Sequence, residues 1–96
     1  MDDKALYLQK IEAELNEWKA QIELFKAKSL NATADVKISM HENINVLEEK
    51  VQEGKAKLAE LGKSTESTFE SMKKTFETKW EIIKTAIKDT TKKLNA

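Results

Sequence analysis

Apolar side chains recur every three or four residues along almost the whole chain, and no proline interrupts them. The first run comprises Tyr7, Ile11, Leu15, Trp18, Ile22 and Phe25, and a later one Phe76, Trp80, Ile83 and Ile87. This spacing places one apolar stripe along a helix, with charged residues on the other face. Alternating strand patterns fail nearly everywhere, and two glycines are too few for the turns of a sandwich or barrel. The chain is therefore expected to be all-α.

The stripe also has a longer repeat of eleven residues. The positions that share this repeat are Phe25, Val36, Leu47, Leu58, Phe69 and Trp80. Eleven residues cover three turns at about 3.67 residues per turn, close to the relaxed value of about 3.6. The repeat predicts straight or slightly right-handed helices rather than a left-handed heptad coiled coil.

One segment, residues 61–67, has the composition of a turn. Gly62 can adopt the left-handed conformation that ends a helix, and Ser67 followed by Glu70 fits a capping box. We therefore predict a single domain over 1–96, with a helix over about 3–61, a turn over about 62–67 and a helix over about 67–94. The fold class is a long antiparallel helical hairpin or coiled coil.

A second, weaker candidate for a break is the segment 29–35, where the apolar stripe thins to small side chains. This segment contains neither Gly nor Pro, and the eleven-residue repeat continues through it, which favours a continuous helix. A break there would instead give three helices and a bundle completed by the chain itself.

The hairpin leaves half of its long helix uncovered, because the shorter helix cannot reach it. A contiguous apolar stripe that faces water marks an interface. The candidate interface is Tyr7, Ile11, Leu15, Trp18, Ile22 and Phe25. A homodimer would complete a three-helix cross-section at these residues, and a break at 29–35 would do so within one chain. Both remain open.

The stripe also predicts which side chains form the core. Those expected to be buried are Ile11, Leu15, Trp18, Ile22, Phe25, Val36, Met40, Leu47, Val51, Leu58, Phe69, Met72, Phe76, Trp80, Ile83 and Ile87.

Catalytic and metal-binding patterns are not found. The chain has no cysteine, and His41 is its only histidine, so neither zinc motifs nor paired Glu-x-x-His sequences can form. The two glycines do not make a phosphate-binding loop. We expect a protein that is not an enzyme and that has no catalytic residues, cofactor or metal.

Charge narrows the class of partner. All 17 cationic residues are lysines, which disfavours specific nucleic-acid recognition, where arginine dominates. Residues 1–61 hold 9 lysines and 12 acidic residues, and residues 62–96 hold 8 and 5. The first segment is therefore net negative and the second net positive. We expect this charge difference to favour self-association as a homodimer or pairing with a heterologous helical partner. The lysine-rich C-terminal helix also permits an alternative function, peripheral binding to a lipid surface.

Three segments carry a family resemblance: Lys4-Ala5-Leu6-Tyr7, Glu17-Trp18-Lys19-Ala20-Gln21-Ile22 and Lys55-Ala56-Lys57-Leu58-Ala59-Glu60-Leu61. With the Ser-rich turn and Trp80 near Lys84, the chain resembles a group of small bacterial coiled-coil proteins described as uncharacterised or stress-responsive. The resemblance implies a cytoplasmic helical protein without site residues to transfer. That group often has Trp where this chain has Phe69. We expect a structural or interaction protein that acts through helix–helix association.

Overall fold

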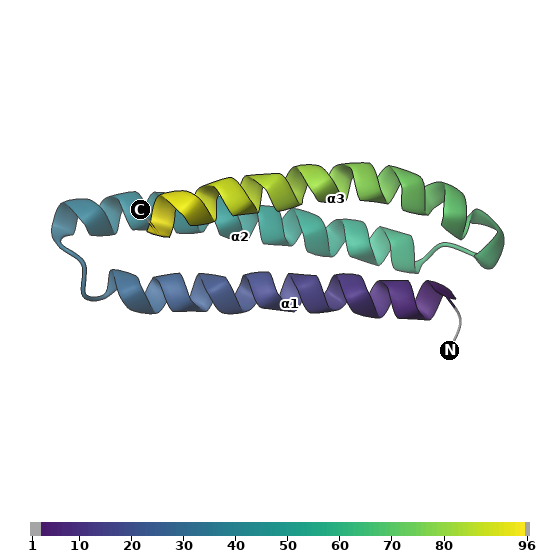
Figure 1. Cartoon of the computed structure of the whole chain (residues 1–96), viewed down its shortest axis with the longest axis horizontal. Helices are drawn as coiled ribbons and strands as arrows, with labels where there is room; N and C mark the ends of the chain where they lie inside the picture. The colour runs from purple at the N-terminus through teal and green to yellow at the C-terminus, as the bar shows by residue number, and fades with distance from the viewer. Residues whose placement is uncertain (1–2, 96) are drawn as a thin grey trace.

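Three helices run up, down and up again in the computed structural model, which describes residues 3–95 (Figure 1). They are α1 (Asp3–Ser29), α2 (Ala34–Gly62) and α3 (Glu66–Asn95). Neighbours in sequence are antiparallel, and α1 and α3 are parallel. The bundle measures 53 × 22 × 18 Å. The all-α prediction is confirmed, and of the two arrangements left open, the chain adopts the three-helix bundle.

The continuous helix predicted over about 3–61 is wrong, because α1 and α2 are separated at residues 30–33. The Ser29 hydroxyl donates to the carbonyl oxygen of Lys26 at 2.7 Å, and Thr33 is extended, with φ −66° and ψ 164°. The amide of Lys37 then donates to the carbonyl of Thr33 at 2.8 Å and begins α2. A break loses only a few helical hydrogen bonds, whereas it allows α2 and α3 to cover the stripe of α1 without a second chain.

The second turn lies where the sequence predicts it, between Gly62 and Glu66. Its geometry differs from the expected one, since neither glycine of the chain, both among the described residues, has a positive φ. A tight turn closes α2 instead, in which the amide of Lys63 donates to the carbonyl of Glu60 at 3.2 Å. The buried Ser64 hydroxyl donates to the carbonyl of Leu61 at 2.7 Å.

The capping box at Ser67 and Glu70 is also wrong, because α3 begins earlier. Thr65 occupies the cap: its carbonyl accepts from the amide of Phe69 at 2.9 Å. Its own amide donates to Thr68 Oγ1 at 3.0 Å. Thr68 therefore performs the reciprocal role that the sequence assigned to Glu70.

The core runs along the axis of the bundle. Its buried apolar side chains are Ile11, Leu15, Ile22, Phe25, Ile44, Leu47, Val51, Leu61, Phe69, Phe76, Trp80, Ile83 and Ile87. Trp18, Met40 and Leu58 pack against it while half-buried. Two predicted core residues, Val36 and Met72, are 51% and 37% exposed, so their assignment is wrong.

Candidate functional site

The predicted interface on α1 faces the interior of this chain. Ile11, Leu15, Ile22 and Phe25 are buried against α2 and α3, and Tyr7 and Trp18 are half-buried. In this fold the six residues are not available to a second copy. A dimer through these residues was expected because a hairpin lacks a third helix to cover them. The break at 30–33 gives the chain that third helix.

Aromatic rings join α1 to α3 along the line where these two helices meet. This aromatic ladder consists of Tyr7, Phe69, Phe76, Trp80 and Trp18. Trp80 stacks on Phe76 with ring centroids 5.1 Å apart and on Trp18 at 4.8 Å. Tyr7 meets Phe69 and Phe76 edge-on at 5.9 and 6.2 Å. Such pairs add about 0.5–1.5 kcal/mol beyond burial. The ladder joins the two helices whose backbones approach each other least closely.

Two carboxylates beside the aromatic ladder, those of Glu14 and Glu77, accept hydrogen bonds from its members across the α1–α3 interface. The indole Nε1 of Trp80 donates to Glu14 at 2.7 Å, and the hydroxyl of Tyr7 donates to Glu77 at 3.3 Å. Burial, and then the charge and hydrogen bond of Glu77, raise the pKa of the Tyr7 phenol to about 12. Tyr7 is therefore a neutral hydrogen-bond donor at physiological pH rather than a general base.

A groove between α1 and α3 has two recesses of opposite character. The first, here the acidic recess, has a volume of about 200 Å³ and is lined by Tyr7, Lys10, Ile11, Glu14, Glu77, Trp80, Glu81 and Lys84. The second, the lysine recess, has a volume of about 290 Å³ and is lined by Trp18, Gln21, Lys84, Ile87, Lys88, Thr91, Lys92 and Asn95. No acidic side chain is among the residues that line the lysine recess.

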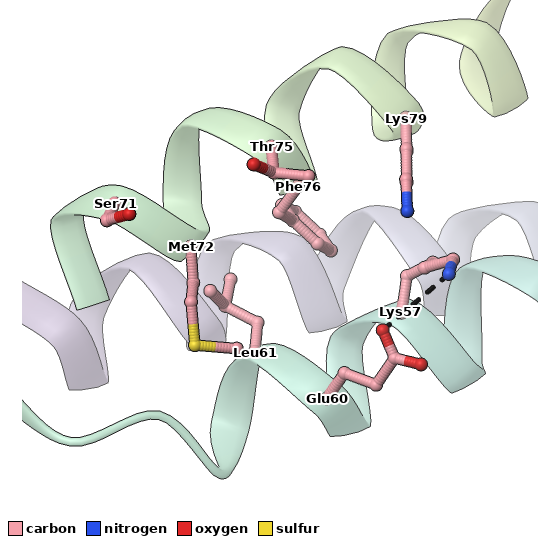
Figure 2. Close-up of a pocket in the computed structure, with 8 residues that line it drawn as sticks. All are labelled: Lys57, Glu60, Leu61, Ser71, Met72, Thr75, Phe76 and Lys79. Atoms are coloured by element: carbon pink, nitrogen blue, oxygen red, sulfur yellow. Dashed lines mark ion pairs between the residues drawn. The ribbon is translucent and has the colours of Figure 1, made fainter. Parts of the chain in front are cut away.

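A third recess lies between α2 and α3, with a volume of about 180 Å³ (Figure 2). Met72, Leu61 and Phe76 provide its apolar surface, and Lys79 extends from α3 toward α2, where Lys57 lies. The ammonium of Lys57 is 3.6 Å from a carboxylate oxygen of Glu60, so its charge is partly met within α2. The recess can hold a small apolar group.

The end of the bundle at the α1–α2 turn carries exposed apolar side chains, of which Val36 was expected in the core and Leu30 and Ile38 carried no prediction. Leu30, Ile38 and Val36 are 74%, 61% and 51% exposed. The eleven-residue repeat includes Val36, but it does not reveal where the other helices stop. A local signal was present in the alternative break at 29–35, since a break there makes residues 30–38 one end of the molecule.

Residues 3–95 contain no group of three or more His, Asp or Glu side chains placed to hold a metal ion. His41 is exposed and lines a shallow recess with Lys26, Ile44 and Glu48. Lys26 and Glu48 form an ion pair of 3.5 Å between α1 and α2. None of the three helices is long and apolar enough to cross a bilayer.

The fold defines the chain as an all-α three-helix bundle with a grooved α1–α3 face. Comparison of the chain with protein-family models, with curated proteins and with solved structures gives no match.

Proposed function

We propose that the chain is a non-enzymatic structural or interaction protein that acts through helix–helix association, with a second copy as its partner. The observation that carries this proposal is the uncovered end of the apolar stripe on α2. Val36 is in phase with the buried residues Leu47 and Ile44 on the same helix, yet it is half-exposed. A role in a bacterial stress response, in the cytoplasm, extends this proposal through the family resemblance.

The geometry of the bundle explains why that stripe is unfinished. The first turns of α2 project beyond the end of α1 and beyond the C-terminal end of α3 (Figure 1). Leu30, in the turn itself, adds to the apolar surface at the same end. What fits this surface is another apolar helix stripe, and a second copy presents an identical unfinished stripe. A two-fold arrangement lets each copy cover the other.

The strength of such a dimer is bounded by its size. A two-fold dimer buries six such side chains at most, three from each copy, and each is only 51–74% exposed before association. The six together therefore contribute about 6–11 kcal/mol, whereas association costs at least about 4 kcal/mol. We therefore expect a dissociation constant of about 10 µM or weaker.

Sedimentation velocity over a concentration series tests the proposal. The weight-average mass should rise from 11.0 kDa toward twice that value as concentration increases. Leu30→Ser combined with Val36→Ser should keep the protein monomeric. Ile82→Ser is the matched control, because Ile82 is 64% exposed in the middle of α3, away from this end. A wild-type protein that stays monomeric at millimolar concentration, or a control variant that abolishes the dimer equally, contradicts the proposal.

Peripheral binding to a lipid surface is a second candidate, favoured by the row of lysines on α3. A lipid-binding protein should gain affinity for vesicles as their anionic content increases, and its Trp18 emission should shift to shorter wavelength on binding.

A further inference from the structure

The lysine recess between α1 and α3 combines an apolar floor with a rim whose charged residues are all lysines. Trp18 and Ile87 form the floor, and Ile87 is buried while Trp18 is half-buried. We propose that this recess binds a single-chain anionic amphiphile, such as a long-chain carboxylate. This inference does not rest on self-association: Leu30, Val36 and Ile38 lie toward the same end of the bundle, but none of them lines the lysine recess.

The rim supplies positive charge that the protein itself does not use. Lys84, Lys88 and Lys92 follow one another at intervals of four, so they lie on one face of α3 over about 12 Å. Within residues 3–95 none of the three has an ion-pair partner at 4.0 Å or less. The helix dipole accounts for a lysine in the last turn, such as Lys92, but not for Lys84, which lies eleven residues before the end of α3.

A polar group in the same recess lacks a partner. The hydroxyl oxygen of Thr91 is covered from water and makes no hydrogen bond, the one such buried side-chain atom in the described chain. Buried hydroxyls are normally paired, because an unpaired one costs about 1–3 kcal/mol. A carboxylate entering the recess would accept a hydrogen bond from Thr91 after a rotation of its side chain, one turn from Lys88 and next to Lys92.

The neighbouring recesses lack this combination. In the acidic recess, Glu14 and Glu77 already accept hydrogen bonds from Trp80 and Tyr7 and would repel an anion. In the recess between α2 and α3, Glu60 competes with any ligand for Lys57. An anion is therefore directed to the C-terminal half of the α1–α3 groove.

Size and shape favour one amphiphile chain over a flat bilayer. The recess has a volume of about 290 Å³, at the lower end of the range of about 300–1,000 Å³ for small-molecule sites. It is a concave channel between two helices, so one acyl chain can lie along Trp18 and Ile87 with its carboxylate among the lysines. A lipid surface would instead contact the protruding faces of the helices.

Titration of the isotope-labelled wild-type protein with decanoate, kept below its micellar concentration, tests the site by NMR. The indole resonance of Trp18 and the amide resonances of residues 84–92 should shift in a saturable way. Far-UV circular dichroism should stay constant over the titration, which separates binding from unfolding. Decyltrimethylammonium, with the same chain and the opposite charge, should produce no saturable shift at these residues.

Two charge-matched variants locate the site on α3. The triple variant Lys84→Gln, Lys88→Gln and Lys92→Gln should weaken decanoate binding about tenfold or more. The control triple variant Lys74→Gln, Lys79→Gln and Lys93→Gln changes the net charge equally and should weaken binding less than about twofold. Thr91→Val, which removes the unpaired hydroxyl but keeps the shape, should weaken binding about threefold without lowering the melting temperature.

Equal effects of the two triple variants would overturn the site, and so would equal binding of the cationic amphiphile. If the first triple variant does not fold, Lys88→Gln alone and Thr91→Val still test the same contacts. Binding only to anionic phosphatidylglycerol vesicles, with no shift from decanoate, would also overturn a single-chain site. In the self-association assay above, Thr91→Val should behave as wild type, so failure of one proposal does not mask the other.

Discussion

The ring of Trp80 lies against the backbone of α2 at Gly54, so closely that a Cβ atom on Gly54 would stand 3.0 Å from Cζ3 of Trp80. The same Cβ would be 3.5 Å from a methyl group of Leu15. The indole cannot easily withdraw, because it donates a hydrogen bond to Glu14 and stacks on two other rings of the aromatic ladder. A glycine inside a helix here permits close packing of α2 against the ladder.

Gly54→Ala should therefore lower the free energy of unfolding by about 1 kcal/mol. The substitution gains about 1 kcal/mol of helix propensity, but overpacking against a fixed ring costs about 1–3 kcal/mol. Urea unfolding followed by circular dichroism measures the difference. Gly62→Ala is the control, since a Cβ there meets nothing within 4 Å, and it should raise stability by up to about 1 kcal/mol. Equal stabilisation by both changes would show that Trp80 moves freely.

Glu14→Leu should destabilise the bundle by about 1–3 kcal/mol, because it leaves the indole N–H of the 4%-exposed Trp80 without an acceptor. Glu14→Gln keeps an acceptor oxygen and should cost less than half as much. Thermal unfolding measures the stabilities. The indole proton resonance of Trp80 should shift by a large amount in the Leu variant and by a small amount in the Gln variant. Glu17→Leu is a matched control on the same helix, where the side chain is exposed. If Glu14→Leu were as stable as Glu17→Leu, the hydrogen bond from Trp80 to Glu14 would not stabilise the bundle.

The apolar period was enough to predict the helical class and most of the core. Residues such as Leu15, Phe76 and Ile83 are buried because side chains three and four positions apart share one face of a helix. The period could not decide between one long helix and two. Phe25, Val36 and Leu47 are eleven residues apart whether or not the chain turns at 30–33, yet Phe25 and Leu47 are buried on two antiparallel helices and Val36 is half-exposed. Spacing is a property of each helix, whereas the break depends on what the helices bury together.

The candidate site was less predictable than the fold. The lysines of α3 could be recognised from the sequence as one group, but the groove they border exists only because α2 reverses the chain and places α3 beside α1. The unpaired hydroxyl of Thr91 and the close approach of Trp80 to Gly54 are tertiary features without a local signature. Val36 is exposed for the same kind of reason, since its burial depends on how far two other helices extend.

The single tyrosine of the chain should titrate abnormally. The pKa of Tyr7 is raised to about 12, mainly by burial and then by Glu77, from an ordinary value of 10.0. Absorbance at 295 nm should therefore show a midpoint about two units higher in the native protein than in urea. Below pH 10 Tyr7 should make no pH-dependent contribution to stability. Between pH 10 and 12 the unfolded chain loses the phenolic proton first, so stability should fall as pH rises.

Glu77→Gln separates the two causes of this shift. It removes the charge of Glu77 but leaves Tyr7 half-buried against Phe69 and Phe76, so the midpoint should fall only part of the way toward 10. Glu70→Gln, an exposed change on the same helix, should leave the midpoint where it is in the wild type. A native tyrosine that titrates as it does in urea would mean that Tyr7 is not packed in the ladder.

Ala34→Pro tests the break between α1 and α2 directly. Ala34 is the first residue of α2, where the amide has no partner within the helix and where proline is favoured. The preceding Thr33 already has the extended conformation that a residue before proline requires, with φ −66° and ψ 164°. Proline also restricts the unfolded chain, so the variant should be as stable as the wild type or more stable by about 0.4–1 kcal/mol.

A continuous helix over 3–61 gives the opposite result at the same position. Proline within a helix removes a hydrogen bond, clashes with the preceding turn and costs about 3 kcal/mol or more. Ala20→Pro, at an exposed position inside α1, supplies that interior penalty as an internal reference. Urea unfolding of the two variants beside the wild type makes the comparison. If Ala34→Pro lost as much stability as Ala20→Pro, residues 30–33 would be helical in solution. The stripe of α1 would then need a second chain to cover it.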